Sequence, residues 1–324
     1  RHSSFDPLAW AGYLEMGLFS SLFVLTVLRD LVLVALLPVE VLARISLLSA
    51  GARQVSAAAV VLAAVLVTLV GVFNARRLAR VVDVELPIAG LPAGLSGFTI
   101  VQISDIHVGS TIKQGYIDAI VGRVNQLEPD LIAVTGDVVD GSVARLAPHV
   151  APLGRLSARH GVYVVTGNHE YYSGVDAWVA ELRRLGLRVL LNESAVLEHG
   201  GARLLVGGVT DYSGHHFDPA HRSDPRAALA GAPRDVALKL LLAHQPRSAA
   251  AAADAGFDVQ LSGHTHGGQF LPWNFFVRFQ QPFTAGLNRL RNLWVYTSRG
   301  TGYWGPPLRF GAPSEITRLR LVAA

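Results

Sequence analysis

The chain has no cysteine and few charged residues. Cysteine is absent from all 324 residues, which excludes disulfide bonds and thiolate metal sites and leaves the redox compartment undetermined. Charged residues make up 16% of the sequence, whereas soluble domains typically carry about 25%, so part of the chain is expected to lie outside water. The net charge of +4 is too small to indicate a nucleic-acid partner. The sequence begins at Arg1 rather than at methionine, which is compatible with further residues and apolar helices upstream.

Two long apolar segments come first in the chain. Residues 8–37 are largely apolar, and residues 55–73 contain no charge. A membrane span needs about 20 mostly apolar residues, so both segments are predicted to be transmembrane helices within a membrane region at residues 1–80. A buried helix of a soluble protein is the alternative for the second segment, and a secretory signal peptide fits poorly because two long segments occur. The pair Arg29-Asp30 is expected near one membrane face or between the two helices.

Arginines flank the second apolar segment on both sides. Arg76, Arg77 and Arg80 follow it, and under the positive-inside rule they place the next domain in the cytoplasm. Arg44 and Arg53 precede it and weaken this asymmetry. We therefore expect a protein integral to the cell membrane, with the domain that follows in the cytoplasm.

From residue 98 the sequence changes to short β-rich runs with helix-like stretches between them. Strands that alternate with helices are typical of an α/β domain, which is predicted at 98–324. The preceding residues 81–97 are rich in glycine and proline and indicate a linker or an edge strand. The strand-like runs are 98–104, 131–136, 162–167, 203–209, 237–244, 257–263, 293–300 and 315–321; the helix-like stretches are 113–126, 142–157, 175–185 and 247–255.

Side chains with oxygen or nitrogen donors stand at the ends of five of these runs. In chain order they are Asp105 and His107, then Asp137, then Asn168 and His169, then His244, and finally His264 and His266. In open α/β sheets ligands bind beyond the carboxyl ends of the strands, so the five sets are expected to converge on one pocket. A lone Asp after a strand is usually a turn former or a helix cap, but five successive sets indicate a shared site.

The donor types favour hard or borderline divalent metals. Carboxylate, imidazole and amide oxygen suit Mn, Fe, Zn or Mg. Six or seven ligands exceed the four of a tetrahedral zinc site, whereas a pair of metals that shares a carboxylate would use them all. Two metals about 3.5–4 Å apart clamp the attacking and leaving oxygens of a phosphoryl transfer. The glycines at 136, 167, 263, 267 and 268 let backbone and ligand approach closely.

The order of these motifs resembles the signature of calcineurin-like metallophosphoesterases. Asp105-x-His107, GDVVD at 136–140, GNHE at 167–170, His244 and GHTH at 263–266 all occur in the order found in that family. The extension GHTHGGQ, the later SRGTG and the closing LRFGAPSEITRLRL are similar to a bacterial subgroup that is often membrane-anchored. The resemblance implies a four-layer α-β-β-α double β-sandwich, here preceded by transmembrane helices, with a dinuclear metal centre.

The resemblance also assigns a role to each donor. It implies a first metal held by Asp105, His107 and His266. It implies a second metal held by Asn168, His244 and His264, with Asp137 as the bridge between the two. His169 is implied as the histidine that contacts the phosphate and protonates or stabilises the leaving oxygen. A metal-bound hydroxide is implied as the nucleophile, because coordination lowers the pKa of water toward neutrality.

One position departs from the pattern of the protein serine/threonine phosphatases in this superfamily. Those enzymes have a phosphate-binding arginine directly after the second Asp of the GD motif, and here that position is Gly141. This disfavours a protein substrate and favours a smaller or lipid-linked one. The second Asp itself, Asp140, is expected to support the metal ligands or to cap the next helix rather than to bind metal.

Other polar and aromatic residues have plainer interpretations. His149, His160 and His199 are expected to face solvent. A loop with Asp211, His215, His216 and His221 is expected to be an ordinary surface loop, with the mouth of the pocket as the alternative. The aromatic run 270–283 predicts either a loop packed on the core or a flap beside the site that faces the membrane.

Together these patterns predict a membrane-anchored, metal-dependent phosphoester hydrolase. Its expected substrate is a lipid-linked or small phosphoester or pyrophosphate, and its other expected partners are membrane lipids. Two alternatives stay open: a phosphodiesterase that acts on soluble substrates such as cyclic nucleotides, and a membrane sensor or scaffold that binds without catalysis. Degenerate ligands would favour the scaffold, and none of the expected ligands is missing.

Overall fold

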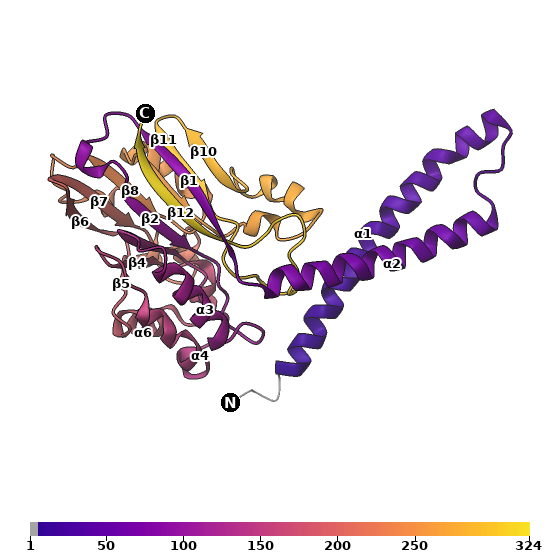
Figure 1. Ribbon diagram of the computed structural model, residues 1–324, viewed down its shortest axis with the longest axis horizontal. Coiled ribbons are helices and arrows are strands. Elements are labelled where there is room, and N and C mark those ends of the chain that lie inside the picture. Colours follow the sequence, from indigo (N-terminus) through magenta and orange to yellow (C-terminus); the bar gives the residue numbers. More distant parts are fainter. Residues whose placement is uncertain (1–5) are drawn as a thin grey trace.

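Two long helices project from a globular domain in the computed structural model, which describes residues 6–324 (Figure 1). They are α1 (Asp6–Ala43) and α2 (Ala50–Arg76), both longer than the predicted apolar ranges 8–37 and 55–73. In its most apolar stretch α1 has 0% of its residues buried and α2 has 11%, unlike a helix in the core of a soluble protein. Both helices are long and apolar enough to cross a membrane.

Polar groups of the two helices bond to each other. Arg29 of α1 donates from Nη2 to the carbonyl oxygen of Arg53 and from Nε to Ser56 Oγ, both in α2. Of the two positions expected for the pair Arg29-Asp30, the structure therefore shows the one between the helices. These bonds satisfy the guanidinium beside apolar surface, where an unpaired charge would be costly.

The segment 81–97 forms an edge strand rather than a free linker. Directly after α2, β1 (Arg80–Ile88) pairs in parallel with β12 (Glu315–Ala323) along its whole length. A short 3-10 helix (Ala93–Leu95) follows before β2 (Thr99–Ile103). The membrane-length helix is thus joined to the domain by a strand of the domain itself.

The domain contains two six-stranded sheets, which confirms the predicted α/β class. The first sheet has the order β1-β12-β2-β3-β4-β5, with β3 (Leu131–Thr135), β4 (Val162–Val165) and β5 (Arg188–Val189). The second has the order β10-β11-β9-β8-β7-β6, with β6 (Glu193–His199), β7 (Ala202–Gly208), β8 (Leu238–Leu242), β9 (Val259–Ser262), β10 (Gly286–Leu290) and β11 (Leu293–Thr297). Strands β2 to β5 are parallel, and so are β7, β8, β9 and β11.

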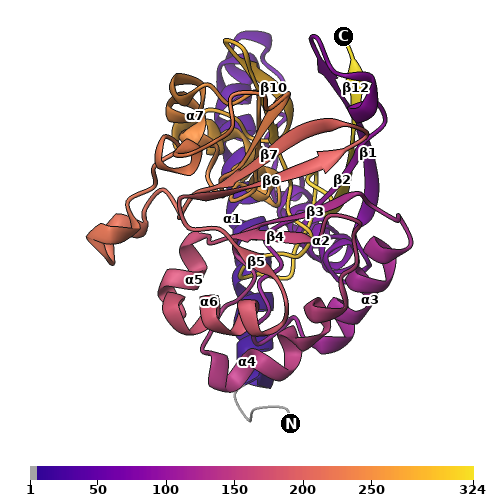
Figure 2. The same ribbon diagram turned by 90° about the vertical axis from the view of Figure 1, so that its left-hand side faces the viewer.

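Alternating side chains of these strands build three hydrophobic layers. Ile100 and Leu240 belong to the core between the two sheets, whereas Val101 points to the opposite face of the first sheet. That face is covered by α3 (Gln114–Asn125), α4 (Val143–Val150) and α6 (Val175–Arg184), and the outer face of the second sheet by α7 (Ala249–Ala255). Figure 2 shows α3, α4 and α6 together on one side and α7 on the other, so the layers follow the expected α-β-β-α order.

Candidate metal centre

The carboxyl ends of strands from both sheets meet at one place. Loops after β2, β3 and β4 of the first sheet carry Asp105, Asp137, Asn168 and His169. Loops after β8 and β9 of the second sheet carry His244, His264 and His266. His107 lies in the same loop as Asp105, so all eight residues predicted for the site meet in this region. They do so because the parallel strands of each sheet end at the same edge.

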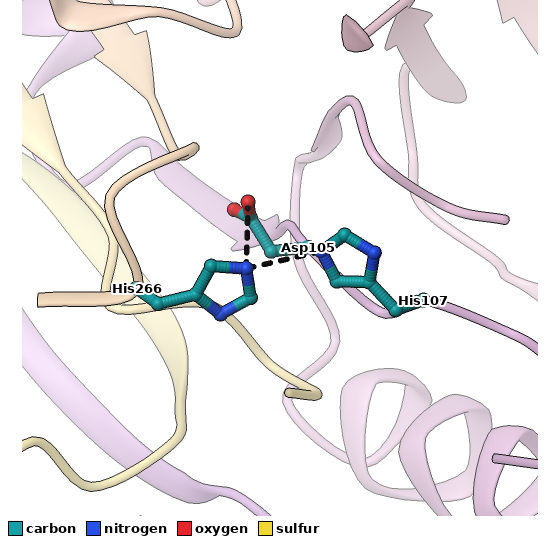
Figure 3. A group of neighbouring side chains, drawn as sticks. All are labelled: Asp105, His107 and His266. Atoms are coloured by element: carbon teal, nitrogen blue, oxygen red, sulfur yellow. Dashed lines mark hydrogen bonds and ion pairs between the residues drawn. The ribbon is translucent and has the colours of Figure 1, made fainter. Parts of the chain in front are cut away.

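A first group of donors consists of Asp105, His107 and His266 (Figure 3). Their ligand atoms lie within 4.8 Å of one another. Nε2 of His266 is 3.0 Å from Nε2 of His107 and 3.4 Å from Oδ1 of Asp105. Two imidazole nitrogens and a carboxylate oxygen that converge in a buried position fit a divalent cation.

A second group consists of His244, His264 and Asn168. Nε2 of His244 is 3.2 Å from Nδ1 of His264. The side-chain oxygen of Asn168 is buried and has no hydrogen-bond partner within residues 6–324. A buried amide oxygen without a partner is costly, so this atom fits the role of a metal ligand.

Asp137 lies between the two groups. Its Oδ2 is 3.1 Å from His244 Nε2 and 3.8 Å from His107 Nε2. Its Oδ1 accepts a hydrogen bond of 2.9 Å from the backbone N–H of His169, which leaves Oδ2 directed at both groups. The residues present therefore fit a pair of metals that share one carboxylate.

The backbone is strained at the residues that supply these donors. Asp105, His107, Asp137, His264 and His266 all have left-handed φ angles, between 51° and 70°. Such angles cost energy in non-glycine residues and cluster at functional sites, because they turn the side chain sharply at the end of a strand. They explain how the two histidines of GHTH, separated by one residue, reach different donor groups.

Two glycines make the close approach possible. A Cβ atom on Gly167 would lie 2.1 Å from Asp137 Oδ1, and one on Gly263 would lie 2.1 Å from Asp105 Oδ2. Any other residue at these positions would displace a carboxylate of the site, so the glycine spacing of the motifs has a direct steric reason.

Two acceptors orient the histidines. Asp140 Oδ1 lies 3.0 Å from His107 Nδ1 and 2.6 Å from His169 Nδ1, so Asp140 supports both rings, as expected. The carbonyl oxygen of Thr135 lies 2.7 Å from His244 Nδ1. When Nδ1 donates to these acceptors, the lone pair of Nε2 in His107 and in His244 faces the site.

Glu170 supports the loop of Asp137 in a way that the sequence did not indicate. Its buried carboxylate accepts hydrogen bonds from the backbone N–H groups of Gly167 (2.6 Å), Asp137 (2.9 Å) and Val138 (2.7 Å). Burial, together with the charge of Asp137, raises the pKa of Glu170 to about 7. Glu170, the last residue of GNHE, therefore stabilises the loops after β3 and β4 through their backbone and is not one of the metal donors.

The histidines of the site fall into two electrostatic classes. Burial and the neighbouring His244 lower the pKa of His264 to about 3, and burial and Arg309 lower the pKa of His266. Burial opposes protonation of His107 as well, but Asp140 prevails and raises its pKa to about 9. His264 and His266 are thus neutral at pH 7 and could bind a cation without losing a proton, whereas a cation beside His107 would have to displace one.

The donors form the floor of a cavity of about 890 Å³. The polar floor comprises His107, Asp137, Asn168, His169, His264 and His266. The same cavity has an apolar wall, which consists of Met16, Phe19 and Phe23 from α1 with Phe270 and Trp273 from the run 270–283. Trp273 Nε1 donates to Ser20 Oγ of α1 at 3.1 Å, which ties the two parts of the wall together. No pattern in the sequence indicates that α1 borders the site.

The middle of the aromatic run 270–283 is a surface flap. The exposed fractions of Phe275, Phe276 and Phe279 are 59%, 53% and 74%, so this part is not packed on the core. Phe283, at the end of the run, packs against the outer hydrophobic layer. Two short 3-10 helices, Trp273–Phe275 and Val277–Phe279, hold these rings outward.

Several other histidines differ from expectation. His160 and His199 do not simply face solvent: His160 Nε2 lies 3.0 Å from His199 Nδ1, and both rings pack on Phe98. In the loop that follows β7, His221 Nδ1 lies 2.9 Å from the hydroxyl of Tyr171. Asp211, His215, His216 and His221 are absent from the residues that line the cavity in the described chain 6–324.

The fold and the donor set define an α/β protein with a candidate two-metal site. Residues 98–268 match the family model of the calcineurin-like phosphoesterases, so the chain belongs to that family. This family typically binds two divalent metals. The flap and everything after it lie beyond the matched residues.

Relatives occur in animals and in bacteria. A "Transmembrane protein with metallophosphoesterase domain" from Bos taurus is 40% identical over 276 residues, which are 82% of this chain and 62% of the relative. Its namesake from Danio rerio is 37% identical over 85% of this chain and 64% of its own length. An "Uncharacterized metallophosphoesterase" from Helicobacter pylori is 39% identical over 69% of this chain and 59% of its own length. The chain thus spans about three fifths of these relatives, and its place in a bacterial subgroup stays a prediction.

Proposed function

We propose that the protein is a two-metal phosphoester hydrolase that α1 and α2 anchor in a membrane. The observation that carries this proposal is Asp137 Oδ2, which lies between two donor groups that include the unpartnered oxygen of Asn168. Asp105, His107 and His266 would hold the first metal, and Asn168, His244 and His264 the second. When bound, two divalent metals polarise the phosphoryl oxygens and bring the pKa of water toward neutrality.

His169 is the residue that we assign to the leaving group. Its Nδ1 is hydrogen-bonded to Asp140, and its Nε2 is directed toward the metal donors, 4.0 Å from Asp137 Oδ2. The rings of Tyr172 and Trp304 pack against it edge to face, with centroids 5.1 Å and 5.8 Å away. A histidine held in one orientation at the cavity floor is suited to donate a proton to a departing oxygen.

The substrate that we propose is a lipid-linked phosphoester or pyrophosphate. The cavity has a polar floor for the phosphate and an apolar wall supplied in part by a membrane-length helix. Each methylene of a substrate chain that is buried on this wall contributes about 0.8 kcal/mol to binding. A soluble diester such as a cyclic nucleotide would use the floor and leave the wall without an apolar partner.

The domain is proposed to lie in the cytoplasm, and its other partners are membrane lipids. Arg76 is the last residue of α2, and Arg77 and Arg80 follow it where the chain enters the domain, in agreement with the positive-inside rule. The exposed rings of Phe275, Phe276 and Phe279 suit the interface of the same membrane. No specific metal is assigned among Mn, Fe, Zn and Mg, because the donor types accept all four.

The activity is tested with the full chain in detergent micelles. Mn²⁺ should support hydrolysis of a nitrophenyl phosphate diester, and a chelator should abolish it. Asp137→Asn should lower kcat/KM by more than about 100-fold, a larger loss than substitutions behind the metal ligands usually cause. Asp118→Asn, which alters a surface pair with Arg155, is the matched control and should retain activity. Full activity of Asp137→Asn would overturn the two-metal proposal.

The substrate class is tested by a comparison of rates. An isoprenoid pyrophosphate in the same micelles should be hydrolysed with a higher kcat/KM than a soluble cyclic nucleotide or diester. A preference for the soluble substrate would replace the lipid-linked proposal with the phosphodiesterase alternative. Tight Mn²⁺ binding without hydrolysis of any phosphoester would favour a scaffold instead.

A further inference from the structure

The segment that precedes β12 connects the two long helices with the metal centre. Leu308 packs against a glycine of each helix. A Cβ on Gly71 of α2 would lie 2.8 Å from Leu308 Cγ, and a Cβ on Gly17 of α1 would lie 3.0 Å from Leu308 Cδ1. Both helices thus approach Leu308 as closely as only glycine allows, which makes this contact sensitive to any displacement of the hairpin.

The backbone of Arg309 is hydrogen-bonded to α2. Its N–H donates to the carbonyl oxygen of Gly71 at 2.9 Å, and its own carbonyl oxygen accepts from Asn74 Nδ2 at 3.2 Å. These two bonds fix the main chain of Arg309 against the helix from both of its polar groups.

The side chain of Arg309 points the other way, toward the first donor group. It is fully buried, and within residues 6–324 no carboxylate pairs with it. Nη1 donates to the carbonyl oxygen of His266 at 2.8 Å, and Nη2 lies 3.0 Å from His266 Nδ1. The remaining donors bond to the carbonyl oxygens of Gly302 and Ala312. Burying a guanidinium without an ion pair costs free energy. We therefore expect the bond from Arg309 to the carbonyl oxygen of His266 to hold His266 in position.

His266 needs such a support because its backbone is strained. Its φ of 51° is left-handed, and this conformation directs Nε2 toward His107 and Asp105 (Figure 3). The bond from Nη1 of Arg309 to the carbonyl oxygen of His266 holds the turn. Nη2 packs beside Nδ1 without donating to it, because a His266 whose Nε2 faces a cation carries its proton on Nδ1. His264, in the second group, forms no hydrogen bond with Arg309 within residues 6–324; its backbone N–H instead donates to Asp105 Oδ1 at 2.9 Å.

We infer that Arg309 is a positioning residue that couples the docking of α1 and α2 to the first metal site. Displacement of the helices moves Leu308 and Arg309, which releases His266 and weakens the first metal while the second keeps its ligands. The inference rests on the proposed two-metal centre and adds to it a physical link from the membrane helices to one of the two ions.

The test separates the two ions by removing one ligand at a time. His264→Ala removes a ligand of the second site, so the first site becomes the stronger of the two. His266→Ala removes a ligand of the first site, so the second site becomes the stronger. Gly71→Leu is added to each background, and Mn²⁺ affinity of the metal-free full chain is measured by titration calorimetry in detergent. Gly12→Leu is the matched control, because Gly12 also lies in a long helix but has nothing within 4 Å of its Cβ position. Arg76 Nη1 donates to the carbonyl oxygen of Thr111 at 2.9 Å, away from Gly71, so we expect α2 to stay attached in the Gly71 variant.

The expected result is a selective loss. Gly71→Leu should weaken Mn²⁺ binding about 10- to 100-fold in the His264→Ala background and leave it unchanged in the His266→Ala background. Equal weakening in both backgrounds, or none in either, would overturn the coupling. Absence of Mn²⁺ binding by the unaltered chain would overturn the two-metal proposal itself, which is a distinguishable failure.

A second variant tests Arg309 without touching the helices. Arg309→Lys keeps the charge but cannot reproduce donors in the geometry of a guanidinium, and the same selective loss is expected. Arg299→Lys is its control, since Arg299 forms an ion pair with Glu315 that lysine can retain. Circular dichroism of each variant reports whether the fold is intact, and an intact Arg309→Lys chain with two unaltered Mn²⁺ sites would contradict the inference.

Discussion

The floor and the wall of the cavity are built on opposite principles. The floor consists of buried histidines and acids on strained turns of the domain, each held by hydrogen bonds. The wall consists of apolar side chains on α1 and the flap, such as Phe19 and Phe23 with exposed fractions of 67% and 55%. If the proposed function is correct, reactivity depends on the floor and substrate choice on the wall, so that each should be alterable without the other.

Among the variants that test this contrast, the largest effect is expected at Asp140, which supports the histidines of the floor. Asp140→Asn keeps the shape of the side chain but removes the charge that faces His107 Nδ1 and His169 Nδ1. Both the metal affinity and the kcat should fall about 10- to 100-fold, on lipid-linked and soluble substrates alike. A loss confined to one substrate class would contradict the idea that the floor acts on all substrates alike. Rates on both substrates, measured at saturating Mn²⁺, decide the matter.

A smaller and selective effect is expected at the wall. Phe19→Ser should lower kcat/KM about tenfold for an isoprenoid pyrophosphate, because apolar contact with the chain is lost, and leave a soluble diester unaffected. Phe73→Ser is a closely matched control: Phe73 lies on α2 with 68% exposure, compared with 67% for Phe19, and does not line the cavity. Equal losses for the two variants would show that the phenylalanines act only through the membrane.

The smallest effect is expected where the flap meets α1. Trp273→Phe retains an aromatic ring but removes the hydrogen bond to Ser20 Oγ. One such bond contributes about 0.5–1.5 kcal/mol, and near the surface we expect a loss of about threefold in kcat/KM, for the lipid-linked substrate only. Trp294→Phe removes a comparable bond to the carbonyl oxygen of Pro87, far from the cavity, and should leave the ratio of the two substrates unchanged.

The sequence predicted the floor well because its residues follow apolar runs. Strands such as β2 and β3 are buried on both faces and read as continuous hydrophobic stretches, so the residues after them could be placed at one edge. β6 and β10 were missed because they are edge strands with many partly exposed residues. The strand ends alone locate the donors. The left-handed backbone turns that orient their side chains have no signal in the sequence and were not needed for this prediction.

The apolar wall and the contacts of Arg309 with α2 and His266 could not be predicted, because both depend on contacts between distant parts of the chain. Phe19 precedes His107 by 88 positions, and the bond from Asn74 to Arg309 spans 235. Local periodicity identifies α1 as apolar but does not say which structure its side chains border. The guanidinium of Arg309 likewise has no sequence signal, since its partners are backbone carbonyl oxygens.

The single methionine of the chain stands in the apolar wall. Met16 is therefore a natural spectroscopic probe: labelling with ¹³C-methyl methionine yields one protein methyl resonance, located where a substrate chain would bind. Because the chain also has no cysteine, a thiol introduced elsewhere can carry a paramagnetic tag at one chosen position. The distance from that tag to the Met16 methyl group then reports the position of α1 relative to the domain, and no native thiol has to be removed first.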